Sequence, residues 1–241
     1  MDGRSTGIRA LFVLSPFRAF VIVFRWRSHV DPSIKALLLD IGGVLLTRGW
    51  GTDSRRRAAD YFGIDYDDLA ERHSAIFHTY EEGRITLDQY LQRIVFYCER
   101  EFTVDQFKEF IYAQSQPYPA MLGFVSELKF RYKLRTVALS NEGREIMDRR
   151  IREFNLTSLI DFFVCSCYVG TLKPDPAIFH FAMDQVQLDR GHMVFIDDSP
   201  LNVEVARELD IQSIHHASYD STRSELAKMG LALGAAARPS M

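Results

Sequence analysis

Five short apolar runs that end in polar residues constrain the fold of this 241-residue chain most strongly. The runs are 35–40 (KALLLD), 134–140 (LRTVALS), 162–166 (FFVCS), 193–197 (MVFID) and 211–215 (IQSIH). They lack the alternation of a half-exposed strand, which is typical of parallel strands covered on both faces. Segments of helical periodicity are predicted between and after them, at 118–131, 143–154, 175–187, 199–209 and 221–229. The pattern predicts an α/β fold with a Rossmann-like, doubly wound parallel sheet and right-handed crossovers.

A long insertion is predicted between the first two strands. About ninety residues without a strong strand signal separate them, which is too many for a simple crossover. Apolar spacing near 3.6 predicts helices at 53–62, 67–79, 86–99 and 104–115, with N-caps at Asp53, Thr86 and Thr103. Proline disfavours helix in the residue before it, so the segment 116–119 (QPYP) predicts an extended return path. We therefore expect an all-helical cap domain at 49–116, an α/β core at 34–48 and 117–233, and a flexible tail at 234–241.

The first 33 residues differ in character from the rest. Five Arg against Asp2 and Asp31 give them a net charge of +3, which leaves −6 on the remainder of a chain whose total is −3. Residues 8–26 are strongly apolar, yet Arg9, Arg18 and Arg25 interrupt them and Pro16 breaks a continuous helix. This pattern argues against a transmembrane helix. An interfacial or targeting segment, a poorly ordered extension and translation from an upstream start codon all stay open, and membrane contact is expected only through residues 8–26.

Charge and cysteine content exclude several classes of protein. The near balance of 29 basic and 32 acidic residues provides no global basic field for nucleic acid. Cys98, Cys165 and Cys167 are an odd set in a chain with ample core-forming residues, which argues against a disulfide framework and favours a reducing, cytoplasmic location. The spacing of Cys165 and Cys167 in an apolar run predicts buried structural thiols. Oligomeric state is left open by the sequence.

Polar side chains gather where the predicted strands end. Ligands of open α/β sheets bind beyond the carboxyl ends of the strands, so these residues are candidates for a site. They are Asp40 and Gly42 after the first run, Ser140 and Asn141 after the second, Lys173 in the loop after the third, and Asp197 and Asp198 after the fourth. Three carboxylates attract Mg²⁺, while a lysine with hydroxyl and amide donors suits phosphate oxygens. The set predicts a joint metal and phosphate site.

The segments LLLDIGGVL, VALSN, LKPDPAIF and VFIDDSPLNVEVA resemble, in order, motifs I to IV of the haloacid dehalogenase (HAD) superfamily. The insertion resembles the helical C1 cap of subfamily I, and 82–86 (EGRIT) resembles the cap loop that faces the active site. The resemblance implies that Asp40 is the nucleophile, which would form an aspartyl-phosphate, and a metal ligand. It also implies that the Gly42 carbonyl, Asp197 and Asp198 complete a Mg²⁺ site. Ser140, the Asn141 amide and Lys173 would hold the phosphoryl group of a small, sugar phosphate-like ester.

Gly42 departs from the superfamily pattern. Most phosphatases of the superfamily place a second Asp there to protonate the leaving group and activate water, and glycine has no side chain that transfers a proton. A subset similar to α-glucose-1-phosphate phosphatases shares the Asp-x-Gly pattern, and Glu81 and Glu82 are candidate substitute donors. A phosphatase is the first hypothesis. A phosphate-ester binding or regulatory protein with weak or no turnover and a metal-independent 2-haloacid dehalogenase are the alternatives.

Overall fold

Five parallel strands form the sheet at the centre of the structure, a computed structural model that describes residues 33–233. In chain order they are β1 (Ala36–Leu39), β2 (Arg135–Ser140), β3 (Phe162–Cys165), β4 (Met193–Asp197) and β5 (Gln212–His215). The spatial order is β3-β2-β1-β4-β5, and in register Leu38 lies opposite Val137 and Phe195. The predicted doubly wound α/β fold is confirmed. Because β1 lies between β2 and β4, the carboxyl ends of these three strands share one edge.

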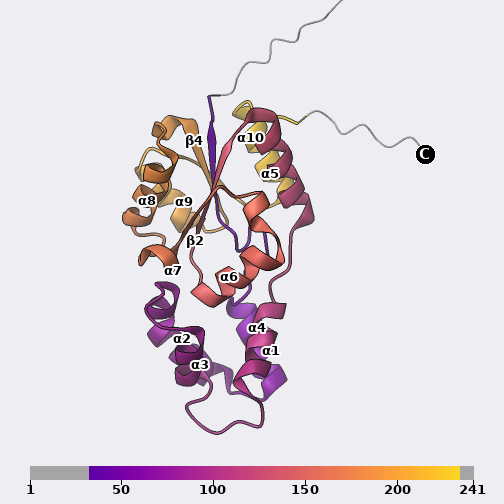
Figure 1. Cartoon of the computed structure of the whole chain (residues 1–241), viewed down its shortest axis with the longest axis vertical. Coiled ribbons are helices and arrows are strands. Elements are labelled where there is room, and N and C mark those ends of the chain that lie inside the picture. The colour runs from indigo at the N-terminus through magenta and orange to yellow at the C-terminus, as the bar shows by residue number, and fades with distance from the viewer. Residues whose placement is uncertain (1–32, 234–241) are drawn as a thin grey trace, which may run out of the picture. The chain divides into compact units, whose positions relative to one another are not determined.

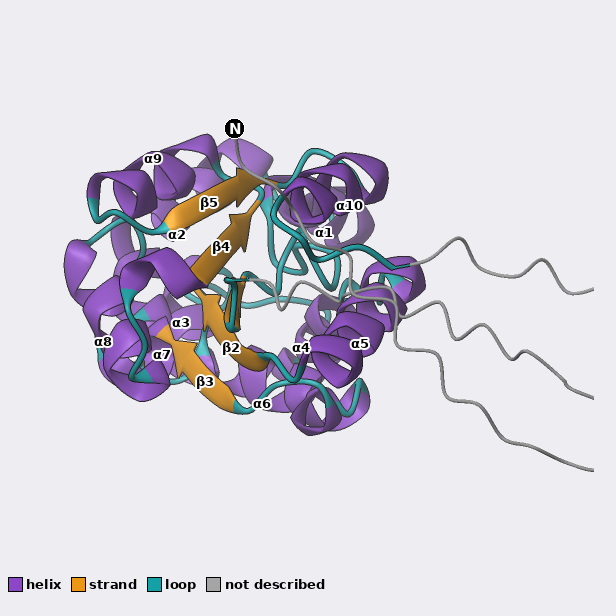
Figure 2. Cartoon of the chain, turned by 90° about the horizontal axis from the view of Figure 1, so that it is seen from above, coloured by secondary structure: helices purple, strands orange, loops and turns teal. Residues whose placement is uncertain are grey.

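Helices cover both faces of this sheet (Figure 2). One apolar cluster packs alternate β1 residues such as Leu37 against α5 (Pro119–Tyr132), α6 (Arg144–Glu153) and α10 (Tyr219–Lys228). The other cluster packs Leu38 against α8 (Pro176–Val186) and α9 (Pro200–Glu208). Three short elements complete this part of the chain, η1 (Leu156–Ser158), α7 (Ser166–Val169) and η2 (Arg190–His192). Burial on both faces explains why the strands read as uninterrupted apolar runs.

Five helices lie between β1 and β2. The last of them, α5, packs on the sheet, and we call the first four the inserted helices (Figure 1). They are α1 (Thr52–Phe62), α2 (Tyr66–Glu81), α3 (Leu87–Ile94) and α4 (Val104–Ala113). They share a cluster of buried residues centred on aromatic rings, in which the Phe107 ring lies 5.7 Å from that of Trp50. The Trp50 indole donates to the Tyr90 hydroxyl at 2.9 Å. The cluster gives the inserted helices an apolar core largely separate from those flanking the sheet.

Two details of the insertion differ from the sequence prediction. Thr86 and Thr103 are N-caps with reciprocal capping boxes, as predicted. Asp53 is not an N-cap, because α1 begins at Thr52 and the carbonyl of Gly51 accepts the first helical hydrogen bond. The helix predicted at 86–99 ends at Ile94, and the buried Val95 that follows has a non-helical φ of −126°. The next residues leave the helical path and bring the Phe96 ring to 5.5 Å from that of Phe102.

The chain crosses between the sheet and the inserted helices in two extended segments that lie side by side. Leu46 and Pro117 form an antiparallel bridge, and the carbonyl of Leu45 accepts from the Tyr118 amide at 2.9 Å. The Thr47 amide donates to the carbonyl of Gln116 at 2.8 Å. This pairing confirms the predicted extended return path for 116–118, whereas Pro119 already begins α5.

The predictions for the N-terminal segment and the C-terminal tail lie outside the described residues. Within 33–233, no helix combines the length and apolar character needed to cross a membrane. The three cysteines all fall within that range and are free thiols; Cys165 and Cys167 are buried, as predicted, while Cys98 is exposed.

We expect Phe107→Ala to destabilise the protein by about 3–5 kcal/mol, because it empties the centre of the inserted cluster. The matched control is Phe130→Ala on α5, whose side chain is 77% exposed and whose removal should cost less than about 1 kcal/mol. Urea denaturation followed by circular dichroism measures both. Equal losses for the two variants would contradict an independently packed core in the insertion.

Candidate functional site

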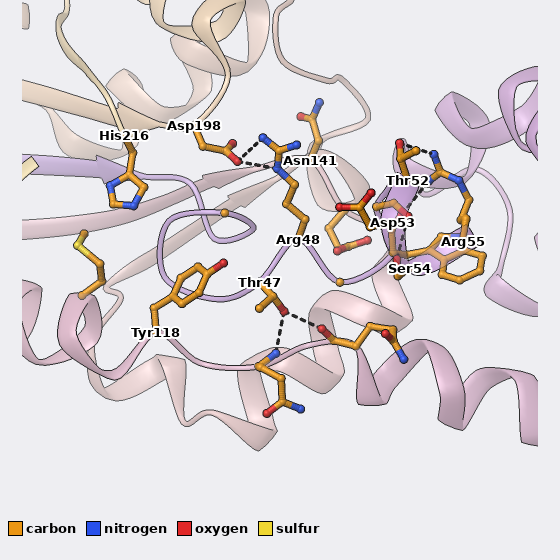
Figure 3. Close-up of a pocket in the computed structure, with 18 of the residues that line it drawn as sticks. Thr47, Arg48, Thr52, Asp53, Ser54, Arg55, Tyr118, Asn141, Asp198 and His216 are labelled. Carbon is orange, nitrogen blue, oxygen red and sulfur yellow. Dashed lines mark hydrogen bonds and ion pairs between the residues drawn. The ribbon is translucent and has the colours of Figure 1, made fainter. Parts of the chain in front are cut away.

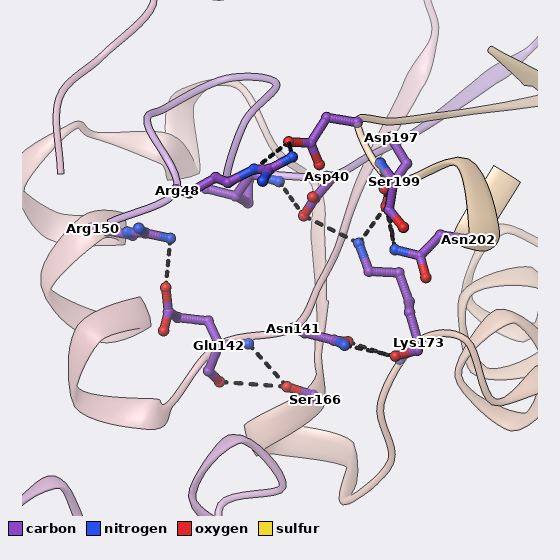
Figure 4. Close-up of polar contacts among 12 residues, drawn as sticks. Asp40, Arg48, Asn141, Glu142, Arg150, Ser166, Lys173, Asp197, Ser199 and Asn202 are labelled. Atoms are coloured by element: carbon purple, nitrogen blue, oxygen red, sulfur yellow. Dashed lines mark hydrogen bonds and ion pairs between the residues drawn. The ribbon is translucent and has the colours of Figure 1, made fainter. Parts of the chain in front are cut away.

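Three carboxylates from two strand ends meet at the carboxyl edge of the sheet, and Figure 4 shows two of them, Asp40 and Asp197. Asp40 follows β1, Asp197 ends β4 and Asp198 comes next in the chain. Each offers an oxygen within 4.8 Å of the others. Asp197 is fully buried and Asp40 is 7% exposed. The parallel sheet therefore brings together acids that are more than 150 residues apart in the chain.

The buried Lys173 amine joins two of these acids. Its Nζ lies 3.1 Å from Oδ1 of Asp40 and 2.6 Å from Oδ2 of Asp197. The loop that carries it is fastened to the end of β2, because the Asn141 side chain accepts from the Lys173 amide and donates to its carbonyl, both at 2.8 Å. Asn141 thus fixes the backbone of Lys173 with its side-chain amide.

Asp197 is held from three directions. Its Oδ1 accepts from the Ser199 amide at 2.7 Å, and the Asn202 amide donates to both oxygens at 3.1 and 3.2 Å. Ser199 and Asn202 stand at the start of α9. With Lys173 on Oδ2, the carboxylate is satisfied in one orientation, which stabilises the charge of this buried group.

The charges and burial of the cluster shift the pKa values of Asp40 and Lys173. Burial raises the pKa of Asp40 to about 6, Lys173 opposes that rise, and the charges of Asp197 and Asp198 add to it. The Ser140 hydroxyl, itself buried, donates to Asp40 and favours the ionised form. Burial also disfavours the charged amine of Lys173, but Asp40 and Asp197 outweigh it and raise the pKa of the lysine. Asp40 is therefore ionised in most molecules at neutral pH.

Arg48 is a site residue that the sequence analysis missed. Its guanidinium binds Oδ2 of Asp198 at 2.7 Å, and its side chain is 67% exposed. It follows the tight loop after Asp40, in which Gly43 has a φ of 89° and packs against the Asp198 carboxylate. The sequence signal that could have identified Arg48 is its position eight residues after Asp40. The turn at 41–46 brings the chain back to the end of β1.

A cavity of about 1340 Å³ opens beside Asp198 (Figure 3). The inserted helices and the loop before them line it with Trp50, Arg55, His73, Phe77 and Glu81, and the strand ends line it with Asn141, Glu142, Asp198 and His216. The Nδ1 atom of His73 lies 2.7 Å from the Tyr90 hydroxyl. Burial lowers the pKa of His73 to about 3, with smaller effects of Arg55 and His78, so this ring is neutral. The cavity has room for a metabolite larger than a phosphate ion.

A second buried ion pair lies behind the cavity. Nη1 of Arg150 is 2.7 Å from Oε2 of Glu142, and their side chains are 1% and 8% exposed. Arg150 also donates to the Ser115 hydroxyl at 2.9 Å and to the Thr47 carbonyl at 3.3 Å. Burial raises the pKa of Glu142 and Arg150 opposes that rise. One guanidinium therefore connects both crossing segments to the end of β2.

Glu81 and Glu82, the two candidate proton donors, have different surroundings in the structure. Glu81 lines the cavity, whereas Glu82 pairs with Arg84 at 2.9 Å. Gly42 lies in the loop after Asp40 and contributes only backbone.

The donor set of the acidic cluster fits magnesium. Asp40, Asp197 and Asp198 supply only oxygen atoms, which hard divalent cations prefer, and the Gly42 carbonyl is a further oxygen in the loop next to Asp40. Lys173 and Arg48 offset two of the three carboxylate charges. The remaining negative charge favours a bound cation.

Comparisons with known proteins identify a family and several relatives. The sequence profile described as haloacid dehalogenase-like hydrolase matches residues 34–210. The chain is 26% identical over 211 residues to the D-ribitol-5-phosphate phosphatase of Bacteroides thetaiotaomicron, covering 80% of this chain and 97% of that protein. A phosphorylated carbohydrates phosphatase of Thermotoga maritima is 26% identical over 193 residues, or 76% of this chain and 84% of that one. A HAD family enzyme of B. thetaiotaomicron, solved as a magnesium complex, matches with a TM-score of 0.64 and 25% identity over 76% of this chain and 92% of the other.

We expect Arg150→Met to destabilise the protein by about 3–5 kcal/mol, because it leaves the buried Glu142 without its cation. The neighbouring Arg149 pairs with Glu153 at 3.0 Å on the surface, so Arg149→Met should cost less than about 1 kcal/mol. The double variant Arg150→Met, Glu142→Gln should recover part of the loss. Urea midpoints measure all three, and an Arg150→Met protein as stable as the wild type would contradict the role assigned to the pair.

Proposed function

Because the chain belongs to the haloacid dehalogenase-like hydrolase family, we propose that it is a phosphatase that removes the phosphoryl group from a small phosphorylated metabolite through Asp40. The observation that carries the proposal is the geometry of Lys173, whose buried amine touches both Asp40 and Asp197. A cation in this place neutralises an anionic nucleophile and an anionic ester that must approach each other. The two phosphatase relatives support the same reaction class.

In the first step, an oxygen of Asp40 attacks phosphorus while the bond to the leaving oxygen breaks, which gives an aspartyl-phosphate. Lys173 stabilises charge on the phosphoryl oxygens, with the Ser140 hydroxyl and the Asn141 backbone amide as further donors. Before the ester binds, the same Ser140 hydroxyl donates its single hydrogen to Asp40, and it becomes a donor to the phosphoryl group when that bond is exchanged. In the second step, water attacks the same phosphorus and releases Asp40 and inorganic phosphate.

Asp40, Asp197, Asp198 and the Gly42 carbonyl would hold Mg²⁺ in this proposal. When bound, the ion would reduce the repulsion between the phosphate ester and the carboxylates. The magnesium complex of the related HAD enzyme supports this choice of metal. Ser199 and Asn202 keep Asp197 in a fixed orientation, which reduces the cost of assembling the site.

The inserted helices would act as the cap, residues 49–116, over the core formed by 34–48 and 117–233. They supply the cavity wall opposite the strand ends, including Phe77 and the neutral His73. An aromatic ring with nearby hydrogen-bonding groups suits the carbon skeleton of a sugar or polyol phosphate. The named substrates of the two phosphatase relatives belong to the same chemical class.

A binding protein without efficient turnover is the second candidate function, and Gly42 is the observation that favours it. No side chain at this position can transfer a proton to the leaving group. Mg²⁺-dependent binding of a phosphate ester, measured by calorimetry without release of phosphate, would identify such a protein.

We expect the purified protein to release phosphate from one or more esters in a panel of sugar and polyol phosphates that includes D-ribitol 5-phosphate. Activity should require Mg²⁺ and disappear with EDTA. Asp40→Asn should reduce it to background, because an amide is a poor nucleophile. Asp60→Asn is the matched control, since Asp60 is an exposed aspartate that does not line the cavity, and it should keep activity within a few fold. Phosphate release by the Asp40→Asn protein would contradict the proposal, as would halide release from 2-haloacids without metal.

A further inference from the structure

The last residue of α2 occupies a distinctive position in the cavity. His73, Phe77 and Glu81 are spaced four residues apart on α2, so they form one stripe, and all three line the cavity. Glu81 is nearest the loop that ends the helix. Glu81 therefore belongs to the part of the cavity wall that the inserted helices form.

Two close contacts fasten the chain on either side of Glu81. Before it, the Tyr80 ring packs so tightly on Gly143 that any side chain at 143 would overlap the ring. After it, Gly83 has a φ of 71° and lies against the carbonyl of Cys167, where a Cβ would overlap backbone. Gly143 follows β2 and Cys167 follows β3, so both contacts are made with strand ends. They hold the end of α2 at a fixed position relative to the site.

Glu81 also differs from the other acids of the cavity in its surroundings. Asp198 is paired with Arg48, Glu142 with Arg150, and Asp53 is exposed. Glu81 is partly buried, and its side chain makes no ion pair or hydrogen bond to another residue in 33–233. Glu82, its neighbour, is paired with Arg84 and does not line the cavity. Only Glu81 thus combines partial burial with a carboxyl group free to reach a ligand.

We propose that Glu81 is the proton donor and acceptor of this active site, in place of the side chain that Gly42 lacks. The inference rests on the proposed phosphatase function. As Asp40 attacks phosphorus and the ester bond breaks, the Glu81 carboxylic acid gives its proton to the departing oxygen, which leaves as an alcohol. The Glu81 carboxylate then takes a proton from water as the water oxygen attacks the aspartyl-phosphate. The bond between phosphorus and Asp40 breaks, and Glu81 is again protonated.

The protonation state of Glu81 agrees with this role. Burial raises its pKa to about 8; the charges of Glu142 and Asp40 also raise it, whereas Arg55 and Lys173 lower it. The carbonyl end of the α2 dipole disfavours a negative charge at this place as well. The acid form is consequently populated at neutral pH, as proton donation requires.

Two aryl esters of similar size test the proposal, namely phenyl phosphate, whose leaving group needs a proton, and p-nitrophenyl phosphate, whose leaving group departs without one. Glu81→Gln should slow phosphoenzyme formation from phenyl phosphate by ~10²–10⁴-fold and from p-nitrophenyl phosphate far less. Loss of the base should slow hydrolysis of the phosphoenzyme. Rapid-quench kinetics of the full chain with Mg²⁺ should then show a burst of p-nitrophenol followed by slow turnover.

Glu82→Gln is the matched control and should leave both rates unchanged. In the wild type, kcat/KM for phenyl phosphate should fall as the pH rises through about 8, because Glu81 ionises, and Glu81→Gln should lack this decline. Equal slowing of both esters without a burst would overturn the proposal, as would an unchanged rate. Activity that survives Asp40→Asn would instead overturn the phosphatase mechanism itself, so the two failures are distinguishable.

Discussion

The contact of one buried amine with two carboxylates is the interaction on which the rest of the site depends. Lys173 touches Asp40 and Asp197, which end neighbouring strands, and without its charge the two acids would repel each other in a medium of low dielectric. The fold supplies every condition for that contact. Parallel strands align the two acids, Asn141 fixes the lysine loop, and α9 begins with the donors that orient Asp197.

The inserted helices contribute a different kind of chemistry from the sheet. Strand ends carry paired charges that are held in place, while the cavity wall on α2 carries a neutral histidine, an aromatic ring and an unpaired carboxyl group. The proposed phosphoryl transfer would use both kinds, because charge must be stabilised at phosphorus and a proton must reach the leaving group. In that proposal, the division of the two tasks between the sheet and the insertion would let substrate preference change without altering the charged cluster.

Much of the fold could be predicted from the sequence because its signals are local. Apolar runs set the strands, and Thr86 and Thr103 set two helix starts through their own side chains. The meeting of Asp40 with Asp197 was predictable for a topological reason, since parallel strands share a carboxyl edge.

Other features depend on tertiary geometry that no local pattern encodes. Arg48 reaches Asp198 only because the turn after Asp40 folds back, and Arg150 finds Glu142 only once α6 packs behind β2. Glu81 and Glu82 are adjacent and chemically identical, so the sequence could not tell which one faces the cavity. Contacts at the end of α2 determine which glutamate faces the cavity, because Tyr80 packs on Gly143 and Gly83 packs on Cys167.

The hydrogen bonds of the Arg150 guanidinium also limit which segments of related proteins could replace the insertion. Its Nε donates to Ser115 within the insertion, while its other nitrogens bind Thr47 and Glu142 of the core. A chimaera that received residues 49–116 from a relative would retain the arginine and its core partners. Unless the donor segment brought a hydroxyl or carbonyl to the same place, a fully buried N–H would lose its acceptor. Replacement of residues 49–116 in this chain would therefore depend on the residue that takes the place of Ser115 as well as on the helices themselves.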